Sequence, residues 1–247
     1  MSDGQEYKRS GSGQRLGVIG GMFDPVHNGH IAVAQHAMDI LQLDKVKLIP
    51  CYHPAHRTNA TASADHRLAM ARLAVKDIDG LEVDPIEINR QGVSYTVDTL
   101  TALRTGSKSP DAILVFILGL DAFTGITGWH QWERLFELTH LLVLGRKGAQ
   151  LDKSMRKAAW FKERLKPGSS HLFKTASGSI YFDSNFAVDI SSTDLRNHMA
   201  ASAHNRIAVG TRKSIDASTR QSTDCTTSLP PAVLNYIREH KLYGYQE

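Results

Sequence analysis

Short apolar runs and amphipathic stretches alternate along most of the chain. Six apolar runs predict β-strands, at Leu16–Ile19, Val46–Ile49, Leu81–Ile88, Ile113–Leu118, Leu141–Leu144 and Ile180–Phe182. Stretches with helical spacing predict helices at Gly29–Leu41, Ala64–Val75, Thr96–Arg104, Gln131–Leu138, Leu151–Leu165, Thr193–Met199 and Pro231–His240. This alternation favours an α/β fold with a doubly wound parallel sheet. In such sheets ligands bind beyond the carboxyl ends of the strands, where the strand order reverses.

Two segments depart from the alternation. Residues 1–14 are polar and rich in Gly and Ser, which predicts a disordered tail without the apolar stretch of a signal peptide. Residues 202–228 are rich in Ser and Thr with little apolar periodicity, which predicts a flexible insertion. We expect residues 15–247 to form a single domain around that insertion.

Composition narrows the classes of function. Hydrophobic residues make up 41% of the 247 residues, enough for a core, and the net charge of +4 suits polyanionic substrates. The basic residues are dispersed and no aromatics interleave with them, which argues against nucleic-acid binding. Cys51 and Cys225 are the only cysteines, which favours a reducing, cytoplasmic location. No apolar run approaches the roughly 20 residues that span a bilayer, so we expect no membrane partner.

A glycine-rich turn joins the first predicted strand to the first predicted helix. From Gly20 to His30 it reads GGMFDPVHNGH. Glycines let backbone N–H groups approach an anion, and the helix start directs its dipole at the same place. His27 and His30 could donate hydrogen bonds to phosphate oxygens there. The spacing fits neither a dinucleotide fingerprint nor a P-loop. The alternative is a plain glycine turn with two surface histidines.

This turn resembles the signature of the nucleotidyltransferase superfamily with a His-x-Gly-His motif. Within that superfamily it is similar to the nicotinate-mononucleotide adenylyltransferases of NAD synthesis, and the similarity covers about residues 16–200 and 229–243. The resemblance implies a Rossmann-like nucleotidyltransferase fold, with His27 and His30 as catalytic residues. It also implies an ATP site that includes Gly20, Gly21, Met22, Phe23, His27 and His30. Met22 stands where the family usually has Thr or Ser, so we expect one hydroxyl contact to the nucleotide to be absent.

A second segment, ISSTDLR from Ile190 to Arg196, has the character of a helix start, because Asp194 follows Ser191 by three residues. Free N–H groups, hydroxyls and Arg196 would then converge on one anion. The alternative is an ordinary capped helix with a solvated arginine. The segment resembles the superfamily motif that holds the triphosphate. The resemblance implies ATP contacts from Ser191, Ser192, Thr193 and Arg196, with Arg196 also catalytic.

Two further basic segments resemble segments of the family that contact ATP. The loop from Pro50 to Arg57 resembles a family loop ending in Pro-Pro-His-Lys/Arg, which makes His56 and Arg57 candidate phosphate contacts. By spacing, His53 and His56 could instead form a metal pair, but no nearby carboxylate completes a ligand set, and we expect no metal site in the protein. Arg146, at a strand end, resembles a basic residue near ATP, with a solvated strand end as the alternative.

The acceptor side is implied by resemblance alone. Tyr95 and Thr96 match a Ser-Tyr-Thr motif that helps hold nicotinate, whose carboxylate would meet N–H groups at a helix start. Asp121 matches a Gly-x-Asp motif that contacts the acceptor nucleotide. Trp129 matches a tryptophan that stacks on the pyridine ring. An ordinary core or surface aromatic is the alternative for Trp129.

The resemblance implies that ATP and nicotinate mononucleotide react to give deamido-NAD and pyrophosphate. Mg²⁺ would arrive on the ATP phosphates, which accords with the lack of an obvious carboxylate cage in the sequence. The alternatives are a sister enzyme that uses nicotinamide mononucleotide or phosphopantetheine, and a nucleotide-binding regulator without activity. A homo-oligomer is also left open.

Overall fold

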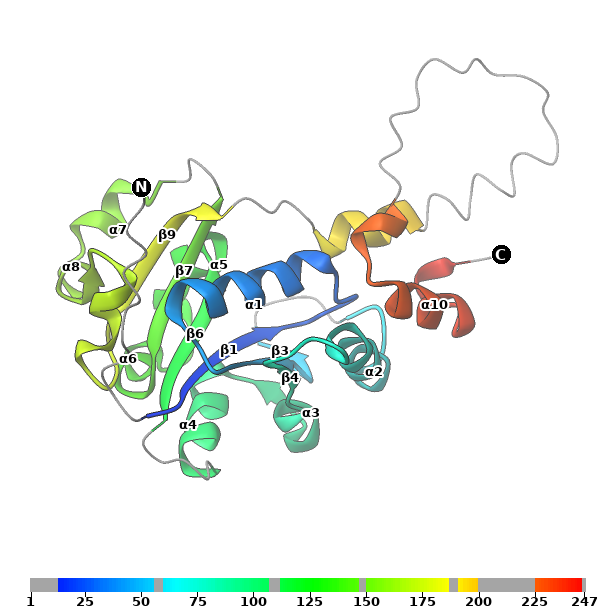
Figure 1. Ribbon diagram of the computed structural model, residues 1–247, viewed down its shortest axis with the longest axis horizontal. Helices are drawn as coiled ribbons and strands as arrows, with labels where there is room; N and C mark the ends of the chain where they lie inside the picture. Colours follow the sequence, from blue (N-terminus) through cyan, green and yellow to red (C-terminus); the bar gives the residue numbers. More distant parts are fainter. Residues whose placement is uncertain are drawn as a thin grey trace, which may run out of the picture.

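A seven-stranded parallel sheet forms the centre of the computed structural model, which describes residues 13–55, 60–106, 112–146, 150–186, 191–199 and 225–245 (Figure 1). In spatial order its strands are β4 Leu81–Val83, β2 Lys45–Pro50, β1 Arg15–Gly21, β6 Ile113–Gly119, β7 His140–Arg146, β9 Ile180–Phe186 and β8 Leu165–Lys166. All neighbouring strands pair in parallel. From β1 the chain continues to β2 and β4 on one side, and from β6 it continues on the other side to β7, to β8 at the edge and back to β9. The strand order therefore reverses between β1 and β6, and the predicted doubly wound sheet is confirmed.

Helices cover both faces of this sheet (Figure 1). They are α1 Asn28–Leu41, α2 Ala64–Val75, α3 Ile86–Arg90, α4 Thr96–Gly106, α5 Leu120–Thr124, α6 Leu135–Leu138, α7 Lys153–Lys157, α8 Ala159–Arg164 and α10 Pro231–Glu239. Residues 192–199 are also helical. The short 3-10 turns are η1 Ile126–Gly128, η2 Trp132–Arg134, η3 Ser169–Lys174, η5 Cys225–Ser228 and η6 Leu242–Gly244. A separate pair of short parallel strands joins β3 His53–Pro54 to β5 Val93–Ser94.

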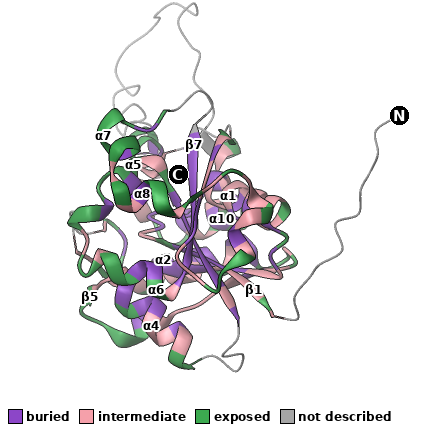
Figure 2. Ribbon diagram, turned by 90° about the vertical axis from the view of Figure 1, so that its left-hand side faces the viewer, coloured by how far each residue is buried: buried purple, intermediate pink, exposed green. Residues whose placement is uncertain are grey.

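Two hydrophobic clusters hold the layers together, one on each face of the sheet. Successive strand residues alternate between them, so Ile19 belongs to the cluster with α1, α2 and α10, whereas Val18 belongs to the cluster with α4, α5 and α6. From α1, Ile31, Ala34 and Leu41 enter the first cluster from a single helix face. Figure 2 shows the central strands buried and the outward helix surfaces exposed.

The predicted strand Leu81–Ile88 is wrong in its second half. Strand β4 ends at Val83, and α3 begins at Ile86. The Asp84 carboxylate accepts a hydrogen bond from the Ile86 backbone N–H at 3.1 Å, and Pro85 lacks an N–H for a strand ladder. The apolar residues at the end of the run therefore lie on a helix.

Two predicted helices are also divided. The prediction of one continuous helix over Leu151–Leu165 is wrong. Ala158 is extended, with φ −60° and ψ 127°, and separates α7 from α8. Leu165 belongs to β8. The predicted helix Gln131–Leu138 starts with Gln131 in the left-handed region at φ +49°, continues as η2 and becomes α-helical only at Leu135.

The predicted tail and insertion lie mostly outside the described residues. Within the tail, the Gln14 carbonyl accepts a hydrogen bond from the Ile113 N–H at 2.8 Å. Within the predicted insertion, residues 225–228 form η5, and the Thr227 carbonyl accepts from Asn28 Nδ2 at 2.9 Å. The last four residues of the predicted insertion thus belong to the folded domain. In the described part of the chain, no helix is long and apolar enough to cross a membrane.

Candidate active site

The turn between β1 and α1 lies at the carboxyl edge of the sheet, beside the reversal of strand order. Gly20 is exposed there at the end of β1. A Cβ atom on Gly21 would lie 3.2 Å from the ring of Phe23, so a side chain at that position would press on the turn. Phe23 is buried, with a left-handed φ of +49° that redirects the chain towards α1.

His27 and His30 stack on one another at the start of α1. Their ring centroids are 3.7 Å apart with an interplanar angle of 27°, and the His27 backbone N–H donates to His30 Nδ1 at 3.2 Å. That bond makes Nδ1 of His30 an acceptor, so the neutral ring carries its proton on Nε2. The buried Nδ1 of His27 has no hydrogen-bond partner among the described residues.

Burial keeps both imidazoles neutral. It lowers the pKa of His27 from 6.5 to about 4. It also lowers the pKa of His30 well below 6.5, and the proximity of His27 lowers it further. Both rings are therefore neutral N–H donors at pH 7, held next to the exposed backbone of the glycine turn.

The Asp24 carboxylate joins several segments beneath this turn. It is 2% exposed and accepts hydrogen bonds from the Thr61 N–H at 2.7 Å, the Ala62 N–H at 3.1 Å and the Tyr243 hydroxyl at 2.7 Å. Each of these bonds spans at least 37 residues of sequence. The carboxylate thus fixes the turn from inside, where water does not compete for it.

The second motif lies directly against the first. Arg196 Nη1 donates to the Asp24 carbonyl at 2.5 Å and lies 3.9 Å from the Asp24 carboxylate, while Nη2 donates to Thr193 Oγ1 at 3.2 Å. The Ser192 hydroxyl donates to the Pro25 carbonyl at 3.1 Å. The Asp194 N–H donates to Ser191 Oγ at 3.4 Å, so Ser191 caps the helix as predicted. Imidazoles, hydroxyls and a guanidinium from two distant segments therefore share one surface.

Sequence reasoning missed Arg67, although its side chain is only 1% exposed. Its guanidinium donates to four backbone carbonyls, those of Met22 (2.8 Å), Cys51 (2.7 Å), Tyr52 (3.2 Å) and Ala62 (3.3 Å). A signal was present, because Arg67 shares the helical spacing of the buried Met70, Ala71 and Ala74. A charged residue on the apolar side of a helix indicates a buried polar network.

The predicted acceptor residues lie around the carboxyl end of β6 and the start of α4. The rings of Tyr95 and His130 are 4.5 Å apart, and Trp129 meets Phe116 edge to face at 6.1 Å. The Phe116 ring lies 3.7 Å from where a Cβ on Gly20 would stand, so it connects Trp129 to the glycine turn.

The other two predicted acceptor residues occupy the starts of helices. Thr96 is the first residue of α4, and Asp121 is exposed in the first turn of α5, directly after β6. Two predicted groups of residues, one with phosphate-binding character and one around Trp129, thus share the edge where the strand order reverses.

Comparisons with known proteins agree with this arrangement. A family model described as cytidylyltransferase-like matches residues 18–198. A curated protein of Acidithiobacillus ferrooxidans, "Probable nicotinate-nucleotide adenylyltransferase", is 37% identical over 231 residues, covering 92% of this chain and 95% of its own. A protein of the same name from Desulfatibacillum aliphaticivorans is 45% identical over 193 residues, covering 74% and 87%. The chain belongs to the nicotinate-nucleotide adenylyltransferase family.

Solved structures share the fold at low sequence identity. The nicotinic acid mononucleotide adenylyltransferase of Plasmodium falciparum complexed with NaAD aligns with a TM-score of 0.66 and 16% identity, over 94% of this chain and 98% of that one. The same protein complexed with APC aligns with a TM-score of 0.65. The Rossmann-like nucleotidyltransferase fold expected from the glycine turn is confirmed.

Three predicted ATP contacts cannot be compared with the structure. His56 and Arg57 fall outside the described residues, as does the side chain of Arg146, which ends β7.

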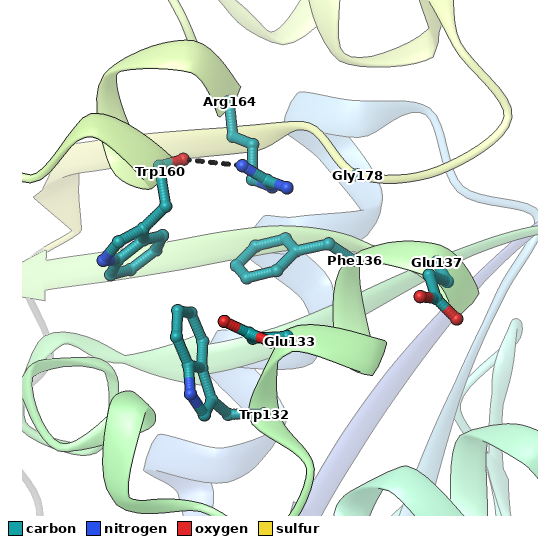
Figure 3. A pocket seen from close by; sticks show the side chains of 7 residues that line it. All are labelled: Trp132, Glu133, Phe136, Glu137, Trp160, Arg164 and Gly178. Carbon is teal, nitrogen blue, oxygen red and sulfur yellow. Dashed lines mark hydrogen bonds between the residues drawn. The ribbon is translucent and has the colours of Figure 1, made fainter.

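A pocket of about 410 Å³ on another part of the surface contains none of the predicted site residues. It is lined by Trp132, Glu133, Phe136, Glu137, Trp160, Arg164 and Gly178, with the three aromatic rings grouped together (Figure 3). Among the described residues, no group of three or more His, Cys, Asp or Glu could hold a metal ion.

Proposed function

We propose that this chain transfers AMP from ATP to nicotinate mononucleotide, giving deamido-NAD and pyrophosphate. The observation that carries the proposal is the meeting of the two motifs, in which Arg196 and Ser192 bond to the backbone of Asp24 and Pro25 beside His27 and His30. Family membership supports the same reaction, because the relatives carry its name.

The acceptor phosphate is already an anion and needs no general base. One of its oxygens attacks the α-phosphorus of ATP in line, while the bond from that phosphorus to the pyrophosphate oxygen breaks. Charge accumulates on the phosphate oxygens, and fixed N–H donors stabilise it. His27 and His30 supply such donors, and their lowered pKa values keep them neutral before the substrate arrives. Catalysis therefore depends on position and charge rather than on proton transfer.

The β- and γ-phosphates are assigned to the helix of residues 192–199. Arg196 presents a partly exposed guanidinium there, and Ser191, Ser192 and Thr193 present hydroxyls at the helix start. Mg²⁺ would be carried by the triphosphate and would neutralise part of its charge, and the side chains named here would hold the phosphates that carry it. The buried Asp24 carboxylate is occupied by its three N–H and O–H donors.

The acceptor is assigned to the neighbouring end of β6. Trp129 stacks on the pyridine ring, Asp121 accepts from ribose hydroxyls, and the N–H groups at the start of α4, at Tyr95 and Thr96, receive the nicotinate carboxylate. This places the acceptor phosphate between the two groups of residues, next to the glycine turn.

A pyrophosphate-release assay tests the proposal. The purified chain is given Mg²⁺-ATP alone, then with nicotinate mononucleotide, nicotinamide mononucleotide or phosphopantetheine. We expect rapid release with nicotinate mononucleotide and little with ATP alone or with phosphopantetheine. Release with no acceptor, or binding of ATP without transfer to any acceptor, would contradict it.

A further inference from the structure

The turn η6 places an aromatic side chain under the proposed phosphate site. Tyr243 is 8% exposed, and its hydroxyl donates to Asp24 Oδ1 at 2.7 Å across 219 residues of sequence. Its backbone is left-handed, with φ +57° and ψ +28°, as is that of Lys241 at φ +51°. Side chains with a Cβ rarely adopt this conformation, so the contacts of Tyr243 hold its backbone there.

The hydrogen-bond donors around the Asp24 carboxylate indicate what the Tyr243 hydroxyl contributes. A carboxylate offers about four acceptor positions. The N–H groups of Thr61 and Ala62 and the hydroxyl of Tyr243 fill three of them. Among the described residues, the cation paired with this carboxylate is Arg196, whose Nη1 lies 3.9 Å from Oδ2, too far for a hydrogen bond. Arg196 Nη1 donates instead to the Asp24 backbone carbonyl at 2.5 Å, and Nη2 donates to Thr193 Oγ1, so the guanidinium is held beside the carboxylate without a hydrogen bond to it.

We propose that Tyr243 is a positioning residue for ATP binding. Its hydroxyl satisfies the Asp24 carboxylate, and the Arg196 guanidinium consequently stays directed at the triphosphate instead of closing a tight ion pair. This inference rests on the proposed function, because it assumes that Arg196 binds phosphate. Without the hydroxyl, a buried carboxylate would lack a donor, and such a group draws in the nearest available one.

The hydroxyl remains a donor throughout the working pH range. Burial raises the pKa of Tyr243, and the hydrogen bond to Asp24 raises it further. Tyr243 therefore keeps its proton at neutral pH and donates to Asp24.

The substitution Tyr243→Phe tests the proposal, with ATP affinity measured by calorimetry and turnover measured separately. We expect ATP to bind about tenfold more weakly, equivalent to about 1.4 kcal/mol. We expect kcat and the KM for the acceptor to change by less than threefold. Tyr245→Phe is the matched control, because that hydroxyl accepts from Arg238 Nε at 2.9 Å, away from Asp24, and it should leave ATP affinity unchanged.

A double-mutant cycle separates positioning from simple structural support. In an Arg196→Ala background, Tyr243→Phe should change ATP affinity by less than twofold. A lower melting temperature with unchanged ATP affinity, or a full tenfold effect without Arg196, would overturn the proposal. If Tyr243→Phe does not fold, it is compared in an Asp24→Asn background. Equal ATP affinity with and without the hydroxyl is expected there, and a difference would overturn the proposal.

The same measurements distinguish this inference from the proposed function. A wild-type protein that binds ATP but releases no pyrophosphate with any acceptor would refute the function, while the affinities would still decide the role of Tyr243. A wild-type protein that binds no ATP would refute both.

Discussion

At the scale of single residues, two neutral imidazoles in contact are central to the proposed chemistry. His27 and His30 stack at 3.7 Å, so protonation of one disfavours protonation of the other. A phosphate anion brought between them and Arg196 would meet donors whose positions are fixed before it binds. Such preorganised donors stabilise developing charge without reorganising during the reaction.

His30→Ala should lower kcat about 10²–10³-fold, the usual loss for one preorganised donor, and should change the KM for ATP far less. Steady-state kinetics with both substrates measures this. The control is His240→Ala, which removes an exposed histidine at the end of α10 and should leave kcat unchanged. A His30→Ala enzyme with near wild-type kcat would remove His30 from catalysis.

The sequence alone indicated the predicted catalytic residues but not the buried contacts that support them. His27, His30 and Arg196 stand in short motifs at helix starts, where local spacing already indicates anion binding. The partners of Asp24 were not predictable, because its bond to Tyr243 depends on how the whole chain returns to the first turn. Local periodicity carries no information on contacts of that kind.

At the scale of elements, Arg67 on α2 holds the glycine turn and the loop after β2 in place. One buried guanidinium holds backbone carbonyls from the glycine turn and from the loop after β2. Lysine could not replace it, because an ammonium lacks the planar fork that reaches several acceptors at once.

Arg67→Lys should reduce the free energy of unfolding by roughly 2–4 kcal/mol, since buried carbonyls would lose their donors at about 1–3 kcal/mol each. Urea denaturation at pH 7.5 measures the change. Arg72→Lys, on the exposed side of the same helix, is the matched control and should cost less than about 0.5 kcal/mol. Equal stability of the two variants would show that the Arg67 network contributes little.

The predicted element boundaries agree with the structure where an apolar run is long and continuous. They disagree where a local turn ends one element and starts the next. The predicted and observed strands agree closely at β6, where the run from Ile113 is continuous. The division after β4 depends on the Asp84 side chain, and the division at Ala158 on a single extended residue. Hydrophobic periodicity continues through both places, so it predicts one element where the structure has two.

At the scale of the whole molecule, buried histidines should make stability depend on pH. Burial lowers the pKa of both His27 and His140 to about 4, against 6.5 for an exposed histidine. Between these values the unfolded chain binds protons that the folded protein does not. The stabilising contribution is complete above pH 6.5 and is lost progressively as the pH falls towards 4.

His27→Asn should therefore make the free energy of unfolding less dependent on pH, by roughly 1 kcal/mol per pH unit between pH 6 and 5. Asparagine is a favourable residue at the N-cap of α1, which helps the variant to fold. Urea denaturation at pH 7, 6 and 5 gives the slopes. An unchanged slope in His27→Asn would contradict a buried, neutral His27.

The order of strands explains why residues far apart in sequence form one site. The strand order reverses between β1 and β6, and both motif loops and the predicted acceptor residues lie at the carboxyl edge of the sheet there. The sequence pattern predicted this class of fold and this edge. It did not predict β8 or the packing of η6, because β8 is two residues long and η6 is positioned by a contact with Asp24, 219 residues away in sequence.

The acceptor preference tests the central claim most directly. Nicotinate mononucleotide and nicotinamide mononucleotide differ by a carboxylate against an amide, and N–H donors at the start of α4 favour the anion. We predict a kcat/KM for nicotinate mononucleotide at least about tenfold higher at saturating ATP, which requires only about 1.4 kcal/mol. Trp129→Ala should weaken both acceptors without reversing their order. Equal kcat/KM values, or a preference for the amide, would contradict the nicotinate assignment.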